Sequence, residues 1–93
     1  MVPITISVPT PLQKYTAGTA RLELSVHDVP ELLECLEQRF PGIKKALVKG
    51  DGGLQPFLNI YVNDEDIRFL GGMQYTFQDG DEVLFVPAIA GGK

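Results

Sequence analysis

The sequence predicts an α+β fold in which a mixed sheet of four or five strands wraps around one main helix. Apolar and polar residues alternate in segments near both ends of the chain, and one segment between them has apolar residues at helical spacing. One helix covers only one face of such a sheet, so the other face is expected to stay open. A chain of 93 residues is long enough for one domain and too short for two.

The composition is typical of a folded globular protein, with 44% hydrophobic residues and charges of both signs. A net charge of -4 disfavours a nucleic-acid partner and favours an electropositive protein partner. The single cysteine, Cys35, cannot form an internal disulfide, and the sequence has no signal-like leader or long apolar run. We therefore expect a cytoplasmic protein with no membrane partner.

The first two strands are predicted from alternation. Residues 4–8 alternate apolar and polar side chains until Pro9 and Pro11 end the segment. Residues 21–26 alternate in the same way after a glycine-containing connection at residues 16–19. This pattern predicts an antiparallel hairpin.

The main helix is predicted to begin after Asp28. A capping acceptor there, Pro30 just after it and an acid at position 31 are typical of a helix start. The apolar stripe of this helix consists of Leu32, Leu33, Leu36 and Phe40. Pro41 and Gly42 should end the helix, and a further short turn is expected over residues 43–48.

The second half of the chain predicts the remaining strands. Residues 57–62 alternate, residues 63–64 form a turn, and residues 67–69 are expected to be a short extended piece. A turn at residues 78–81 leads to a last strand at residues 82–87. The resulting order, ββαβ(β)β, is that of a β-grasp domain spanning residues 1–87.

The last strand is apolar at each of residues 83–86, which is typical of a strand in the centre of a sheet. Because a helix covers only one face, the open face should carry some of Tyr61, Leu84 and Val86. An exposed apolar patch of this kind marks a partner surface.

A flexible tail carrying a diglycine is expected over residues 88–93. Its residues are Ala88, Ile89, Ala90, Gly91, Gly92 and Lys93. From residue 88 to Gly92 the tail spans at most ~17 Å, enough to reach another protein's buried site. Two glycines without β-carbons can pass a narrow channel and leave the carboxyl carbon open to attack.

A β-grasp order that ends in this tail resembles the ubiquitin-like sulfur carriers of the MoaD/ThiS family over the whole chain. Residues 57–69 with Gly71 and Gly72, together with residues 87–92, look most like the CysO-type carriers of cysteine biosynthesis. The ending at residues 87–92 is shared with the small subunit of molybdopterin synthase.

The resemblance implies that the chain is a substrate and not an enzyme, and that it binds no cofactor itself. An E1-like enzyme would adenylate the carboxylate of Gly92 with ATP, and sulfur would displace AMP to leave a thiocarboxylate. Gly91 would give access, and the tail at residues 88–90 would guide Gly92 into its partners. The sulfur would then reach an activated serine or homoserine derivative on a cysteine-synthase-like acceptor that contains pyridoxal phosphate (PLP).

Lys93 follows the diglycine, so Gly92 has no free carboxylate in this sequence. The resemblance implies a zinc-dependent peptidase of the JAMM type that removes Lys93, and a cloning remnant explains this residue equally well. The same fold and tail also fit a molybdopterin-synthase small subunit or a ubiquitin-like modifier conjugated to lysines. A pure binding module with an incidental tail is a further alternative.

No internal catalytic or metal site is expected. The acids at residues 64–66, 79 and 81 match no EF-hand spacing and are interpreted as solvated turn acids. His27 is interpreted as a capping or surface residue and Cys35 as a semi-buried thiol. Six basic residues are too dispersed to form a basic stripe in the sequence: Lys14, Arg21, Lys44, Lys45, Lys49 and Arg68.

Overall fold

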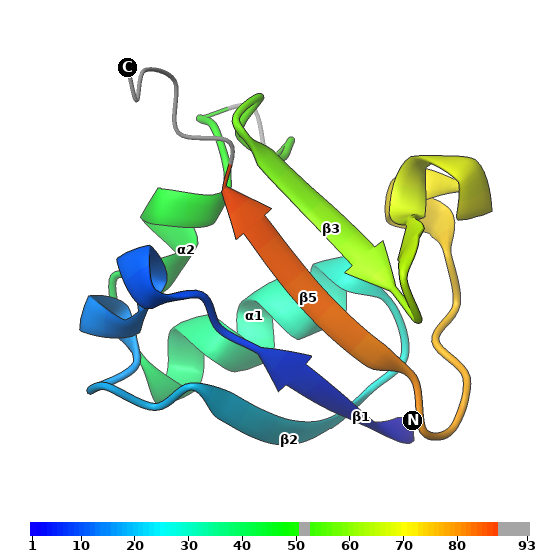
Figure 1. Cartoon of the computed structure of the whole chain (residues 1–93), viewed down its shortest axis with the longest axis horizontal. Coiled ribbons are helices and arrows are strands. Elements are labelled where there is room, and N and C mark those ends of the chain that lie inside the picture. The colour runs from blue at the N-terminus through cyan, green and yellow to red at the C-terminus, as the bar shows by residue number, and fades with distance from the viewer. Residues whose placement is uncertain (51–52, 88–93) are drawn as a thin grey trace.

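The computed structural model describes residues 1–50 and 53–87, and it confirms the predicted β-grasp fold (Figure 1). The strands are β1 (Val2–Ser7), β2 (Arg21–Val26), β3 (Leu58–Val62), β4 (Glu65–Asp66) and β5 (Glu82–Pro87). The α-helices are α1 (Val29–Arg39) and α2 (Ile43–Leu47). Three short 3-10 helices complete the described chain: η1 (Thr10–Tyr15), η2 (Ile67–Leu70) and η3 (Gly72–Gln74).

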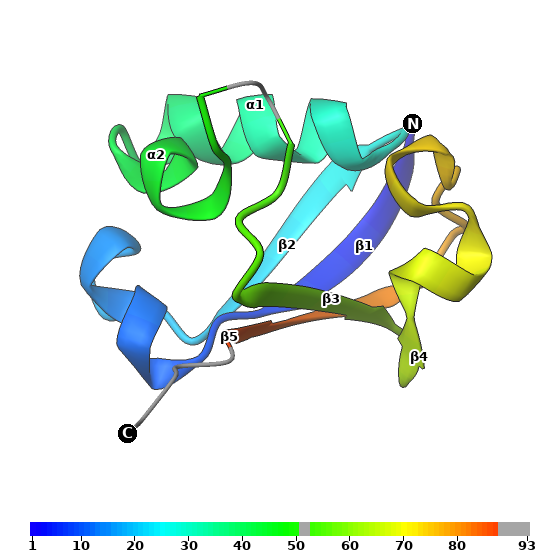
Figure 2. The ribbon, with the colours of Figure 1, turned by 90° about the horizontal axis from the view of Figure 1, so that it is seen from above.

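The five strands form one mixed sheet in the order β2-β1-β5-β3-β4. The predicted hairpin of β1 and β2 is antiparallel, and β5 lies parallel to β1 and antiparallel to β3. The last strand therefore occupies the centre of the sheet, as its run of apolar residues predicts. Figure 2 shows α1 and α2 on one side of the sheet and no α-helix on the side that faces the viewer in Figure 1.

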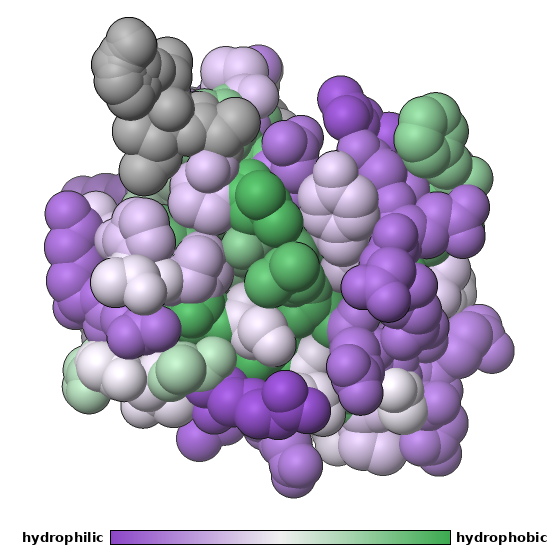
Figure 3. All heavy atoms as spheres, viewed as in Figure 1, coloured by the Kyte–Doolittle hydropathy of each residue, from purple (hydrophilic) through white to green (hydrophobic). Residues whose placement is uncertain are grey.

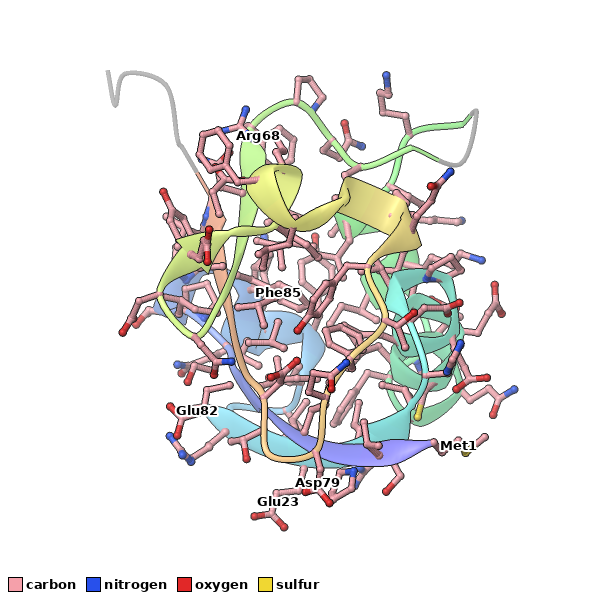
Figure 4. The ribbon with its side chains drawn as sticks, turned by 90° about the vertical axis from the view of Figure 1, so that its right-hand side faces the viewer. Met1, Glu23, Arg68, Asp79, Glu82 and Phe85 are labelled. Atoms are coloured by element: carbon pink, nitrogen blue, oxygen red, sulfur yellow. The ribbon has the colours of Figure 1, made fainter. Side chains whose placement is uncertain are left out.

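The core lies between the sheet and α1. Alternate residues of the central strand, Val83 and Phe85, are buried on the helix side, and Figure 4 shows Phe85 inside the body of the molecule. Strand β3 contributes its own alternate residues, Leu58, Ile60 and Val62, to the same core. None of the helices in the described part of the chain is long and apolar enough to cross a membrane.

Helix α1 begins with a reciprocal cap. The Asp28 side chain accepts a hydrogen bond from the Glu31 amide at 3.0 Å, and a Glu31 carboxylate oxygen accepts one from the His27 amide at 2.6 Å. The helix ends before Gly42, whose φ of +103° lies in the left-handed region that favours glycine. The predicted start and end of this helix are therefore confirmed.

The segment after β3 differs from the prediction in one element. Residues 67–69 form the helix η2 and not an extended piece, because the Asp66 carboxylate accepts a hydrogen bond from the Arg68 amide at 2.9 Å and caps a helical turn. The short extended piece is instead β4, which pairs with β3 across the tight turn at Asn63 and Asp64. Both turn residues have positive φ, as a two-residue hairpin requires.

The interpretation of all five acids in this region as solvated was wrong for Asp66 and Asp81. Asp66 is 8% exposed and Asp81 is 4% exposed. The Asp81 carboxylate accepts hydrogen bonds from the Asn63 side chain and the Tyr75 hydroxyl. These two groups replace water around the Asp81 carboxylate, and the Arg68 side chain does the same for Asp66. Both acids are therefore structural residues of the segment between β3 and β5.

Candidate functional site

The predicted reacting residue and its tail lie outside the described residues. These are Gly92, Gly91, Ala90, Ile89, Ala88 and Lys93. The structure describes the chain as far as Pro87, the last residue of β5, which pairs with Leu58 of β3. The described part of the candidate site is therefore the body of the domain, namely the open face of the sheet and the surroundings of Pro87.

The predicted partner residues lie together on the open face. Tyr61 of β3 is directly opposite Leu84 of β5, and Val86 lies two residues further along the same face of β5. Leu84 is 40% exposed, and the other two residues are half-buried. We call these three residues the open-face patch. Figure 3 shows apolar side chains gathered in the middle of this face between more polar margins.

Strand alternation explains why the patch exists. Phe85 and Val83 point toward α1, so Leu84 and Val86 must point away from it. No α-helix covers that side, and an apolar surface therefore remains in contact with solvent (Figure 2). Its role as a partner surface remains a prediction.

Beside β3, one exposed aromatic side chain was missed by the sequence analysis. Phe69 of η2 is 78% exposed, and it follows Arg68, whose guanidinium binds the Asp66 carboxylate at 2.6 Å. This hydrogen-bonded ion pair lowers the pKa of Asp66. Arginine and aromatic residues are enriched in protein interfaces. In the sequence, Phe69 lies among the apolar residues Ile67 and Leu70, and nothing there distinguishes an exposed side chain from a buried one.

The beginning of β5 is held by a hydrogen-bonded cluster. The Asn63 amide donates to the Glu82 carbonyl at 2.8 Å, and the Asn63 side-chain oxygen accepts from the Glu82 amide at 2.9 Å. The Tyr75 hydroxyl donates to the Asp81 carboxylate at 2.7 Å. Burial, together with this acidic partner, raises the pKa of Tyr75 to about 12. The strand that leads to the tail is therefore fixed at its start as well as along both edges.

A groove surrounds the other end of β5. It has a volume of about 340 Å³, and we call it the tail-root groove. Its lining comes from four separate segments and includes Leu12, Lys14, Tyr15, Lys45, Phe57 and Pro87. The lysines are dispersed in the sequence, and the fold brings two of them together here. No signal in a local stretch of sequence could have revealed this.

The other candidate residues from the sequence, Cys35 and His27, do not line the open-face patch or the tail-root groove. Cys35 is half-buried and packs against the core, and His27 is exposed with its backbone bound to Glu31 and Phe77. Within residues 1–50 and 53–87, no three histidine, cysteine, aspartate or glutamate side chains are grouped so that they could hold a metal ion.

Comparisons with known proteins agree with this architecture. Residues 6–92 match the ThiS family. The chain is 41% identical over 91 residues to the sulfur carrier protein CysO of Mycobacterium tuberculosis, and the match covers 96% of this chain and 98% of the relative.

Two solved structures are similar over nearly the whole chain. One is from the BexX/CysO complex of Amycolatopsis orientalis, with a TM-score of 0.87, 44% identity, and coverage of 96% of this chain and 99% of that chain. The other is the small archaeal modifier protein 1 of Methanosarcina acetivorans, with a TM-score of 0.85, 31% identity, and coverage of 99% and 98%.

Proposed function

The chain belongs to the ThiS family, and we propose that it is a sulfur carrier of the CysO type that delivers sulfur from a thiocarboxylate on Gly92. The observation that carries the proposal is the extent of the family match, which runs through the diglycine to residue 92. In the structure, the central strand that leads to this diglycine ends at Pro87, beside an open sheet face.

The proposed chemistry begins with activation of the carboxylate. A carboxylate is a poor electrophile until one of its oxygens becomes part of a good leaving group. An E1-like enzyme would join the Gly92 carboxylate to the α-phosphate of ATP and release pyrophosphate. A sulfur nucleophile would then attack the acyl carbon, and AMP would leave with its oxygen. The product is a thiocarboxylate, in which one sulfur has replaced one oxygen.

The role of this chain in that sequence is to present the carbonyl carbon. Residues 88–92 would extend at most ~17 Å from the body of the domain into the enzyme's active site. The open-face patch of Tyr61, Leu84 and Val86 would hold the body against the partner while the tail is inserted. The chain is thus a co-substrate, and ATP belongs to its activating enzyme.

We propose cysteine or a related sulfur amino acid as the product. On the PLP-containing acceptor synthase, the thiocarboxylate sulfur would form a bond to the β-carbon of an activated serine, or to the γ-carbon of an activated homoserine, and the activating acyl or phosphate group would leave. The resulting Gly92 thioester would rearrange by an S-to-N acyl shift to an amide, which a peptidase can hydrolyse. A peptidase of the JAMM type would remove Lys93 before activation and release the finished amino acid afterwards. Both cuts fall directly after Gly92, so one enzyme could perform them.

Sulfur transfer tests this proposal. Chain ending at Gly92 and carrying a 35S-labelled thiocarboxylate is mixed with a PLP-dependent synthase, O-acetylserine or O-phosphoserine, and a JAMM peptidase. We expect label in free cysteine. Label that stays on the protein with every activated serine and homoserine derivative would refute this acceptor class. Chain carrying an ordinary carboxylate is the control.

A second function is favoured by the similarity to a small archaeal modifier protein. In that case the activated Gly92 would form an isopeptide bond with a lysine of a target protein. Tryptic peptides from cells that carry a diglycine remnant on lysine, and that disappear when the gene is deleted, would support conjugation. Free thiocarboxylate without such remnants would support sulfur delivery alone.

A further inference from the structure

The tail-root groove combines apolar walls with positive charge. Tyr15 and Phe57 supply apolar surface, and Phe57 is 42% exposed, whereas Leu12 also lines the groove but is almost fully buried. Lys14 and Lys45 lie at the same groove, and both are exposed. No aspartate or glutamate is found among the lining residues that the structure describes. This is unusual surface for a chain whose net charge is -4.

The two lysines of the groove are available for a partner. The Lys14 ammonium lies 5.3 Å from the centre of the Tyr15 ring, a weak cation–π contact, and within the described chain neither Lys14 nor Lys45 forms an ion pair. Lys44, next to Lys45, is instead bound to Glu34. The pKa of Glu37 is lowered by hydrogen bonds from the Gly42 and Lys44 amides and also by the charges of Lys44 and Lys45. Glu37 therefore partly offsets the charge of Lys45 without forming an ion pair with it. Among the described residues, Lys14 has no carboxylate in an ion pair with it.

Three exposed acidic residues lie away from the groove, toward the beginning of β5. Figure 4 shows Glu23, Asp79 and Glu82 at the end of the molecule that holds Met1. Strand β5 runs from this end to Pro87, so its two ends differ in charge (Figure 1). Glu37 and the groove residue Lys45 line an adjoining pocket, where the Glu37 carboxylate accepts hydrogen bonds from the Gly42 and Lys44 amides. The net charge of the chain is negative, whereas the charged residues that line the groove at Pro87 are lysines.

The position of the groove restricts what can cover it. Pro87 is part of its lining, and Gly92 lies five residues further along the chain. Five residues span at most ~17 Å, so an enzyme that encloses Gly92 must also approach the surroundings of Pro87. This step rests on the proposed function, in which an activating enzyme encloses Gly92.

We propose that the tail-root groove binds an acidic segment of the enzyme that activates Gly92. An apolar side chain of that segment packs against Tyr15 and Phe57, and its carboxylates pair with Lys14 and Lys45. Charge complementarity of this kind steers association and fixes the register of two surfaces. The groove would thus orient the domain while the tail enters the active site.

The test is the KM of the carrier in ATP–pyrophosphate exchange with its E1-like enzyme, using chain that ends at Gly92. Lys45→Glu and Lys14→Glu are compared with Arg39→Glu, which makes the same charge change at an exposed position of α1 outside the groove. We expect each groove variant to raise KM roughly three- to tenfold at low salt with little change in kcat, and Arg39→Glu to leave KM within about twofold. The difference should shrink in 1 M salt, where the Debye length falls to about 3 Å.

Four outcomes would overturn the inference. Equal KM values for groove and control variants would show that only net charge matters, or that charge has no effect. A difference that persists in 1 M salt would rule out charge pairing. A lowered KM in Lys45→Glu would indicate that a segment of this chain occupies the groove. A dimer that Lys45→Glu dissociates in sedimentation would assign the groove to a second copy. If the unsubstituted chain ending at Gly92 supports no ATP–pyrophosphate exchange, the proposed activation itself is refuted. The two failures are therefore distinguishable.

Discussion

Tyr61 and Leu84 lie directly opposite each other on β3 and β5, on the face of the sheet that no α-helix covers. This pair puts an aromatic and an aliphatic side chain at the centre of the open-face patch. Apolar cross-strand pairs stabilise a sheet by packing against each other. Here the cross-strand pair stabilises the sheet and leaves surface for a partner.

The first prediction concerns this patch. Leu84→Asp should lower the free energy of unfolding by no more than about 2 kcal/mol and leave the protein folded, because Leu84 is 40% exposed although Asp is disfavoured in a strand. The same change should raise the KM for carrier in the activation assay about five- to thirtyfold, corresponding to roughly 1–2 kcal/mol of binding energy. Ser25→Asp, on the same face but at the edge strand β2, is the matched control. Equal KM values for both variants would exclude the patch as the docking surface.

The second prediction tests the alternation of β5. Phe85→Ala should lower the free energy of unfolding by about 3–5 kcal/mol because Phe85 is a fully buried core residue. Leu84→Ala, one residue away, should lower it by less than about 1.5 kcal/mol. Urea unfolding followed by circular dichroism measures both. Losses of similar size would mean that the two faces of β5 are wrongly assigned.

The third prediction concerns the start of α1. Asp28→Ala removes the acceptor of the Glu31 amide and should cost about 1 kcal/mol of stability. Asp79→Ala removes an exposed acid from the turn before β5 and should change stability by less than about 0.5 kcal/mol. If the two variants unfold at the same urea concentration, the side-chain cap contributes nothing measurable.

The fourth prediction is a pH dependence caused by Tyr75. Its folded-state pKa is raised to about 12, whereas an unfolded tyrosine has a pKa of about 10. The folded protein therefore holds this proton more tightly, so the stabilisation is complete below about pH 10 and is lost as the pH rises toward 12. Tyr75→Phe should show a shallower loss of stability in this range than the original protein. Identical slopes in urea unfolding between pH 9 and 12 would contradict the assignment of Tyr75.

Local sequence was sufficient for the central features of the sheet. Alternation in residues 57–62 and the apolar run at residues 83–86 predicted that the open face carries some of Tyr61, Leu84 and Val86, because successive side chains of a strand point to opposite faces. The structure places all three there. The helix boundaries were equally local, since Asp28 caps its own helix and Gly42 ends it.

Two features of the segment between β3 and β5 were not predicted, one decided by a local cap and one by partners from other parts of the chain. Residues 67–69 alternate like a strand, but the Asp66 carboxylate bonded to the Arg68 amide favours a helical turn instead. Asp81 appeared to be a solvated turn acid, and only the fold brings Asn63 and Tyr75 around its carboxylate. A short alternating segment therefore carries too little information to separate a strand from a capped turn.

The tail-root groove shows the same limit for function. Lys14 and Lys45 are separated by the whole of β2 and α1 in the sequence, and each appears there as an isolated surface residue. The sequence predicted an electropositive partner from the net charge, whereas the surface around Pro87 fits an electronegative one. Net charge describes the average of a surface and not the part that a partner contacts.

The central claim, that Gly92 becomes a thiocarboxylate, is tested most directly by intact-protein mass spectrometry. Chain ending at Gly92 is incubated with ATP, sulfide and an E1-like enzyme, beside chain that retains Lys93 and a reaction without ATP. We predict that only the complete reaction with chain ending at Gly92 gains mass, by the difference between one sulfur and one oxygen. An unchanged mass, under conditions in which the enzyme converts a known ThiS-family carrier, would contradict the account.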